Sequence, residues 1–429
     1  MSEGQTVPAA TGGTARPVLL GAAGLHMVTQ TALAPFYPAL FRSAYGIRDL
    51  AATGLFLMLC QLAAVIVLPL WGRATRHVPL ARLVTAGQAA AVLLAGALSL
   101  APSYLVFTLL SVALIMAKSV VLLAYPAVAR SHPKGLLCGV VQYVAVLHVA
   151  AVGATVLGTV VVAVPDPRAA LPLLAVAEAV LLGACVMLLR VRREPAFSRP
   201  SAAQEPVAAH EPVAAQEPVA ASRPSRALVR LAVFVLVNFV AVTAVRPYFT
   251  EYAAEGGASI TSASLLFVLP HLAVLAVLPA TRTLRRRFGG RLLPMALALA
   301  AAGLLEQAVT TEAVPLAIGR LLFGAGLGLA QVAFDERVLT ITGSGAAYSL
   351  VAAAQTCGLL LAPLLATATA SAALAGPLLA GAALLAVLAV LVRGDAPPAP
   401  TQETASPTMF KAVVPAAADR RQASAPAAR

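Results

Sequence analysis

Residues 50–71 read LAATGLFLMLCQLAAVIVLPLW, a run of 22 residues without a charged side chain. The hydrocarbon core of a bilayer is about 30 Å thick, and an α-helix crosses it with about 20 apolar residues. A strand of a membrane barrel is only about 10 residues long and alternates between apolar and polar side chains, which this run does not do. The stretch therefore predicts a membrane-spanning helix.

Runs of the same kind fill the chain on both sides of this one. Of the 429 residues, 60% are hydrophobic and 11% are charged, whereas a water-soluble protein carries about 25% charged residues. The expected fold class is therefore an all-α membrane protein with twelve transmembrane helices. The predicted spans are residues 17–40, 50–71, 83–101, 104–128, 136–163, 170–189, 228–250, 261–280, 292–310, 314–334, 346–368 and 373–392.

The positions of arginine and lysine predict the orientation. The five loops after spans 2, 4, 6, 8 and 10 hold 18 of these residues, whereas the other loops hold three, Arg42, Arg48 and Arg168. Loops rich in positive charge stay in the cytoplasm, so both termini are expected there. The Ala-, Arg- and Pro-rich composition is typical of a GC-rich bacterial genome, and a bacterial inner membrane is expected. The net charge of +13 then reflects topology, and no nucleic-acid partner is predicted.

Residues 191–227 interrupt the pattern. Glu205-Pro206-Val207-Ala208-Ala209 recurs from Glu211 and again from Glu217. Proline at this density does not continue a helix, and the segment has little apolar surface to bury. We predict a disordered cytoplasmic linker that lets two bundles move, with binding of a partner as the alternative. The linker would join six-helix bundles at 17–190 and 228–392, and the tails 1–16 and 393–429 are also predicted to be disordered.

The two halves share a short repeat. Thr31-Ala32-Leu33-Ala34-Pro35-Phe36-Tyr37 ends the first span, and Thr243-Ala244-Val245-Arg246-Pro247-Tyr248-Phe249 ends the seventh. Each half has six spans, an even number, so the second half would enter the membrane from the same side as the first. Corresponding spans of the two halves would then run in the same direction. This pattern predicts a parallel repeat, in which a six-helix unit has been duplicated.

With these features the chain resembles the major facilitator superfamily over residues 17–392, and in particular its bacterial exporters with twelve spans. The loop after span 2, Gly72-Arg73-Ala74-Thr75-Arg76-His77, keeps the glycine and the arginines of the family motif but lacks its aspartate. Gly153 and Gly158 match part of the antiporter motif in span 5, without the following proline. The resemblance implies that spans 1, 4, 7 and 10 line a central cavity, that spans 6 and 9 are peripheral, and that transport proceeds by alternating access.

Ionisable side chains inside the spans are the first candidates for the site, because each costs about 2.5–3.5 kcal/mol to insert. We predict that Lys118, Arg246 and Arg320 bind substrate. The chain has no acid between Asp49 and Asp166, so no acid in spans 2 to 5 can neutralise Lys118. The partner of Lys118 would be water, a carboxylate of the other half or an anionic substrate. For the two arginines, the alternatives are extension toward the membrane surface or pairing with Glu251.

Other polar residues complete the predicted site. The polar residues expected to help bind substrate are His26, Gln30, Asn238 and Gln331. The candidates for proton coupling are Glu178, Glu306 and His148. The residues expected to form an inner gate are Asp335, Glu336 and Arg76. The alternatives are hydrogen-bonded packing for the acids and histidines, and a solvated helix end for the gate. The four cysteines lack metal-ligand spacing, so no metal or other cofactor is expected.

These residues predict a secondary active transporter rather than an enzyme. No nucleotide-binding loop is recognisable, so the energy source would be an ion gradient, with protons as the expected ion. Cations in the interior, without acids on spans 1, 4 and 7, favour a small organic anion such as a siderophore-like natural product. The resemblance implies a monomeric exporter, partnered by protons and membrane lipid. The alternatives are a multidrug efflux pump, an importer of the same fold, a passive channel or scaffold, and a membrane-embedded transferase, which the short loops disfavour.

Overall fold

The computed structural model describes residues 15–75, 77–120, 136–191, 225–342 and 346–393, and within these ranges the regular structure is entirely helical. The predicted linker 191–227 and the tails 1–16 and 393–429 lie almost wholly outside the described residues. The elements are α1 Ala15–Thr31, η1 Ala34–Phe36, α2 Tyr37–Tyr45, α3 Leu50–Ala74, α4 Leu80–Leu98, α5 Tyr104–Lys118, α7 Leu136–Ala163, α8 Pro167–Ala170, α9 Pro172–Val191, α10 Arg226–Ala244, α11 Phe249–Glu255, α12 Ile260–Val277, η3 Leu278–Ala280, α13 Thr281–Phe288, η4 Gly289–Arg291, α14 Leu292–Ala308, α15 Ala313–Thr342, α16 Ala346–Ala370 and α17 Gly376–Arg393.

Eight helical segments of the described chain are long and apolar enough to cross a membrane, so the protein is a multi-pass membrane protein. They are Leu50–Ala74, Leu137–Ala163, Pro167–Met187, Arg226–Glu255, Ile260–Ala308, Ala313–Val338, Leu350–Ala370 and Gly376–Arg393. Two further apolar helices, Arg82–Leu98 and Tyr104–Lys118, are shorter, and the segment Ile260–Ala308 contains two of the predicted spans in one helical run. The count of twelve spans therefore stays a prediction.

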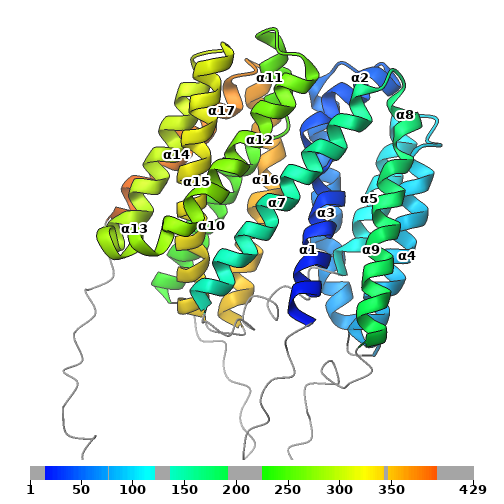
Figure 1. Cartoon of the computed structure of the whole chain (residues 1–429), viewed down its shortest axis with the longest axis horizontal. Coiled ribbons are helices and arrows are strands. Elements are labelled where there is room, and N and C mark those ends of the chain that lie inside the picture. The colour runs from blue at the N-terminus through cyan, green and yellow to red at the C-terminus, as the bar shows by residue number, and fades with distance from the viewer. Residues whose placement is uncertain (1–14, 76, 121–135, 192–224, 343–345, 394–429) are drawn as a thin grey trace, which may run out of the picture.

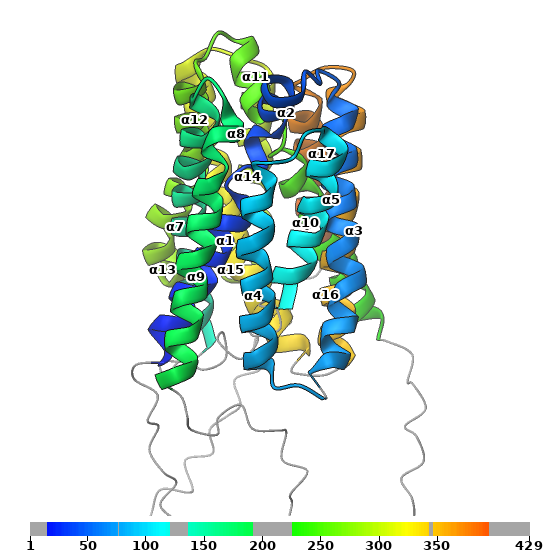
Figure 2. The ribbon, with the colours of Figure 1, turned by 90° about the vertical axis from the view of Figure 1, so that its right-hand side faces the viewer.

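The helices run side by side with their axes roughly aligned (Figures 1 and 2). In the N-terminal half, residues 15–191, α4 packs against α5 and α9, and α1 packs against α7 and α9. In the C-terminal half, residues 226–393, α14 packs against α15 and α17, and α10 packs against α16 and α17. The halves meet where α7 packs against α12 and α15, and where α3 packs against α16.

The repeated heptapeptides form matching turns. After α1 the chain turns through Pro35 into the short helix α2, and after α10 it turns through Pro247 into α11. Proline lacks the N–H that would continue each helix, so both helices stop shortly before the proline, α1 at Thr31 and α10 at Ala244. The two turns touch, because the hydroxyl of Thr250 donates a hydrogen bond to the carbonyl of Pro35. We call this end of the molecule, with α2, α8 and α11, the α11 end (Figure 1).

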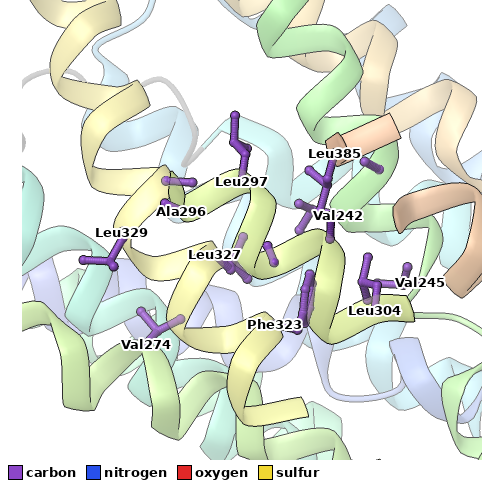
Figure 3. Packing of buried hydrophobic residues seen from close by; sticks show 14 of the residues in the cluster. Val242, Val245, Val274, Ala296, Leu297, Leu304, Phe323, Leu327, Leu329 and Leu385 are labelled. Carbon is purple, nitrogen blue, oxygen red and sulfur yellow. The ribbon is translucent and has the colours of Figure 1, made fainter. Parts of the chain in front are cut away.

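Close helix packing in the C-terminal half depends on the glycines of α15. Gly324 and Gly328 face α12, and Gly326 faces α14, so α15 lies in a narrow space between two backbones. Phe323 and Leu327 extend from the same helix into the apolar core, as Figure 3 shows. Small residues at this spacing let the backbones of neighbouring membrane helices approach closely.

Because of this packing, a larger side chain at Gly326 should destabilise the protein. A Cβ at Gly326 would lie 2.5 Å from both the carbonyl oxygen of Ala296 and the amide nitrogen of Ala300. We expect Gly326→Leu to lower the free energy of unfolding by about 1–3 kcal/mol, as overpacking does. Thermal unfolding in detergent measures the loss. Gly183→Leu on α9 is the matched control, since a Cβ there meets nothing within 4 Å; equal stability of the two variants would contradict the prediction.

Candidate functional site

The polar side chains inside the helices gather in two places. Five of them come together within the N-terminal half and form what we call the lysine cluster: His26, Thr29, Gln88, Lys118 and Glu178. Five others meet where the two halves touch and form what we call the interface cluster: His148, Arg246, His271, Arg320 and Gln331.

The centre of the lysine cluster is a buried ion pair. The Nζ atom of Lys118, at the end of α5, lies 2.6 Å from Oε1 of Glu178 on α9, and each side chain is 2% exposed. Lys118 also donates to the hydroxyl of Thr29 at 2.7 Å, and the amide of Gln88 donates to the other carboxylate oxygen of Glu178. Each charge is thus compensated inside the helical bundle, as burial requires.

This arrangement corrects the sequence analysis. Lys118 was expected to face water, a carboxylate of the other half or an anionic substrate, but its partner is Glu178 of the same half. In the structure α9 packs against α1 and α4, and Glu178 points inward with 1% of its surface exposed. A carboxylate in an apolar environment is more stable beside a cation than in lipid, which accounts for its inward orientation.

His26 of α1 lies beside this pair. It is 2% exposed and within electrostatic range of Lys118. Neither of its ring nitrogens has a well-aligned hydrogen-bond partner in the described chain. Gln30, one turn further along α1, is half-buried and is a polar neighbour of the ring.

The interface cluster includes a pair of histidines from different halves. The Nδ1 atoms of His148 on α7 and His271 on α12 are 2.8 Å apart, and both side chains are buried. The Nε2 atom of His148 lies 3.1 Å from Oε1 of Gln331 on α15. Three helices are therefore joined by one chain of hydrogen bonds across the boundary between the halves.

Arg320 of α15 is held by backbone carbonyls. Its Nε and Nη2 atoms donate to the carbonyls of Leu266 and Phe267 at 3.0 Å each, and Nη1 donates to Oε1 of Gln307 at 3.4 Å. The carbonyl of Leu266 is available because Pro270, four residues later, has no N–H to donate to it. The guanidinium also lies 3.9 Å from the centre of the Phe249 ring, a cation–π contact.

Arg246 differs from Arg320 in having no such support. It lies in the turn between α10 and α11 and is partly exposed, and its guanidinium has neither a hydrogen bond nor an ion pair with another described residue. Its electrostatic neighbours are His148, His271 and Arg320, all of them basic. A guanidinium among other basic groups is suited to bind an anion, since its planar donors match a carboxylate.

The two halves are also joined at the α11 end. Arg42 of α2 and Glu251 of α11 form a two-pronged ion pair, with both N–O distances at 2.9 Å. Glu251 was one of the predicted partners of Arg246 and Arg320, and the structure shows that it binds Arg42 instead. The hydroxyl of Tyr248 donates to the carbonyl of Leu50 at 3.0 Å and adds another link between the halves.

The remaining predicted residues are more scattered. Asn238 is half-buried on α10, and Glu306 is half-buried on α14, outside both clusters. Of the predicted inner gate, Glu336 pairs with Arg285 of α13, Asp335 is half-buried on α15, and Arg76 lies outside the described residues. The inner gate stays a prediction.

Several residues of the two clusters were not predicted to belong to the site. His271 carries half of the histidine pair, and Gln88 and Thr29 hold the ends of the Lys118–Glu178 pair. For His271 a signal was present, since it is an ionisable group in the middle of an apolar run. No feature of the sequence distinguished Gln88 or Thr29 from other polar residues within the spans.

The fold and the two clusters define the class of this protein. It is a helical multi-pass membrane protein with one polar cluster inside its N-terminal half and another between its halves. No family model matches the chain, and no curated protein matches it. Among solved structures it is similar to the crystal structure of nucleoside transporter NupG, with a TM-score of 0.59 and 13% sequence identity. The match covers 89% of this chain and 99% of that chain, so the two share a fold.

Proposed function

We propose that the protein is a secondary active transporter, with twelve spans in two six-helix bundles, as in the major facilitator superfamily. The fold shared with a transporter along almost its whole length supports this proposal. The bundles would rock about their boundary and expose a central site alternately to each side. By the positive-inside rule, the end with α13, which carries Arg285, Arg286 and Arg287, would face the cytoplasm, and the proposed location is a bacterial inner membrane.

The proposed substrate is a small organic anion, and Arg246 is the observation that carries this proposal. Its guanidinium donors are free of protein partners within the described residues, and the neighbouring Arg320 adds a second positive charge. A cation or a neutral nucleoside would leave that charge unbalanced. A polycarboxylate, such as a siderophore-like metabolite, would balance it.

Export is the proposed direction, with protons as the coupling ion. An anion that leaves a cell with a negative interior gains about 2.3 kcal/mol per charge for each 100 mV of membrane potential. The Arg42–Glu251 pair and the Tyr248–Leu50 contact would form the outer gate, which has to open to release the substrate. Arg285 and Glu336 would belong to the inner gate.

Counterflow in proteoliposomes tests the substrate class. The purified full chain is reconstituted with internal fumarate or citrate, and entry of the same labelled acid is followed. Uridine and the lipophilic cation tetraphenylphosphonium serve as the neutral and cationic probes. We expect accelerated exchange of an organic acid and none of the other two. Exchange of uridine or of the lipophilic cation without exchange of either acid would overturn the anion proposal.

A further inference from the structure

The contact between His148 and His271 has room for one hydrogen between its two Nδ1 atoms, which are 2.8 Å apart. A neutral imidazole has one N–H and one acceptor nitrogen. With Gln331 oriented as in the structure, Nε2–H of His148 donates to Oε1 of Gln331. Nδ1 of His148 is then the acceptor, and Nδ1–H of His271 is the donor. This assignment leaves Nε2 of His271 free to take a proton.

This arrangement determines how many additional protons the His148–His271 pair can bind. One additional proton on Nε2 of His271 gives an imidazolium that still donates its Nδ1–H to His148, so the contact between the halves persists. A second additional proton would have to go to Nδ1 of His148. Two N–H groups would then face each other across 2.8 Å, and the contact would break. The pair therefore binds one proton while the helices stay in place.

We propose that the His148–His271 pair is the proton-binding site of the transport cycle and that it takes up one proton together with the anion bound at Arg246. This inference rests on the proposed anion transport and names its coupling site. His148 comes from one half and His271 from the other, so the proton would be held where the halves move against each other.

The charges around the pair determine how proton and anion influence each other. Arg246 and Arg320 are the charged groups that act on the pair. The described residues of α1, α7 and α12 contain no carboxylate, and Glu251 of α11 is bound to Arg42. On α15, the acid nearest to Gln331 in the sequence is Asp335, one helical turn further along.

A proton on the pair adds a third positive charge to this group, and a bound anion compensates it. Each ligand thus strengthens the binding of the other, and this coupling is reciprocal. Proton and anion would therefore travel in the same direction, in contrast to the antiport that the resemblance to exporters implies. An anion with two charges and one proton still carries net negative charge, so the membrane potential drives it outward.

Proton movement during transport tests the proposal in proteoliposomes that contain the full chain. The probe is fumarate, a dicarboxylate that is fully ionised at neutral pH, and a pH-sensitive dye in the lumen reports protons. We expect fumarate efflux to make the lumen more alkaline. In His148→Gln and His271→Gln the number of protons moved per fumarate transported should fall at least tenfold, whatever rate of fumarate counterflow remains. His77→Gln, in an exposed loop, is the matched control and should change neither.

An unchanged number of protons per fumarate in both variants, or protons that move opposite to fumarate, would overturn the inference while leaving anion transport intact. Absence of fumarate counterflow in the wild type would count against the proposed function instead. A second measurement needs no substrate: NMR of the purified chain with ¹⁵N-labelled histidine rings. The two rings should titrate together in a single one-proton step, and replacing either histidine should change the titration of the ring that remains. Independent titration of the two rings would contradict the shared site.

Discussion

Replacement of Arg246 with glutamine is expected to abolish transport of the organic anion. Glutamine keeps a polar side chain in the turn between α10 and α11 but removes the charge that no group of the described protein compensates. Removing one partner of a desolvated charge pair costs about 2–5 kcal/mol, which corresponds to a fall in affinity of at least about 30-fold. Counterflow of the labelled acid in proteoliposomes, measured over a range of acid concentrations, gives the change directly.

Two further variants separate binding from folding. Arg246→Lys keeps the charge but loses the planar pair of donors, so partial activity is expected. Arg226→Gln removes an exposed arginine at the start of the same helix and should leave transport unchanged. All three variants should unfold at the temperature of the wild type, because Arg246 supports no other described side chain. Wild-type affinity in Arg246→Gln would show that the anion binds elsewhere.

The helices could be predicted from the sequence because a bilayer selects them by length and hydrophobicity alone. The run at residues 50–71 forms most of α3, and residues 46–49 separate α2 from it. The glycines of α15 could also be assigned a role, since a missing side chain has the same consequence whichever helix approaches. These are properties of short segments, and no knowledge of the three-dimensional arrangement is needed to read them.

The partners within the site depend on which helix faces which, and the sequence does not determine this. Lys118 and Glu178 are 60 residues apart, and His148 and His271 are 123 apart. Arg320 was recognised as a buried cation, yet its partners are the carbonyls of Leu266 and Phe267, and the sequence does not show which helix supplies them. Backbone groups freed by a proline are available to any neighbouring helix, so only the packing of α12 against α15 identifies them.

The Lys118–Glu178 pair should be the site where single substitutions cost the most stability. Lys118→Met leaves the carboxylate of Glu178 without its cation, and Glu178→Gln leaves the ammonium of Lys118 without its anion, each at 2% exposure. An uncompensated buried charge costs about 3–5 kcal/mol. We expect each single variant to lose that much free energy of unfolding, and the double variant, which has no charge left, to recover most of it.

Unfolding in detergent mixtures, followed for the wild type and the three variants, gives the coupling energy as a double-mutant cycle. The Arg42–Glu251 pair is the matched control, because its arginine is 49% exposed and an exposed pair contributes only about 0–1 kcal/mol. Additive losses at Lys118 and Glu178 would mean that the two charges do not stabilise each other. A stable Glu178→Gln variant that no longer transports would instead place Glu178 in the transport cycle, the proton-coupling role predicted for it from the sequence.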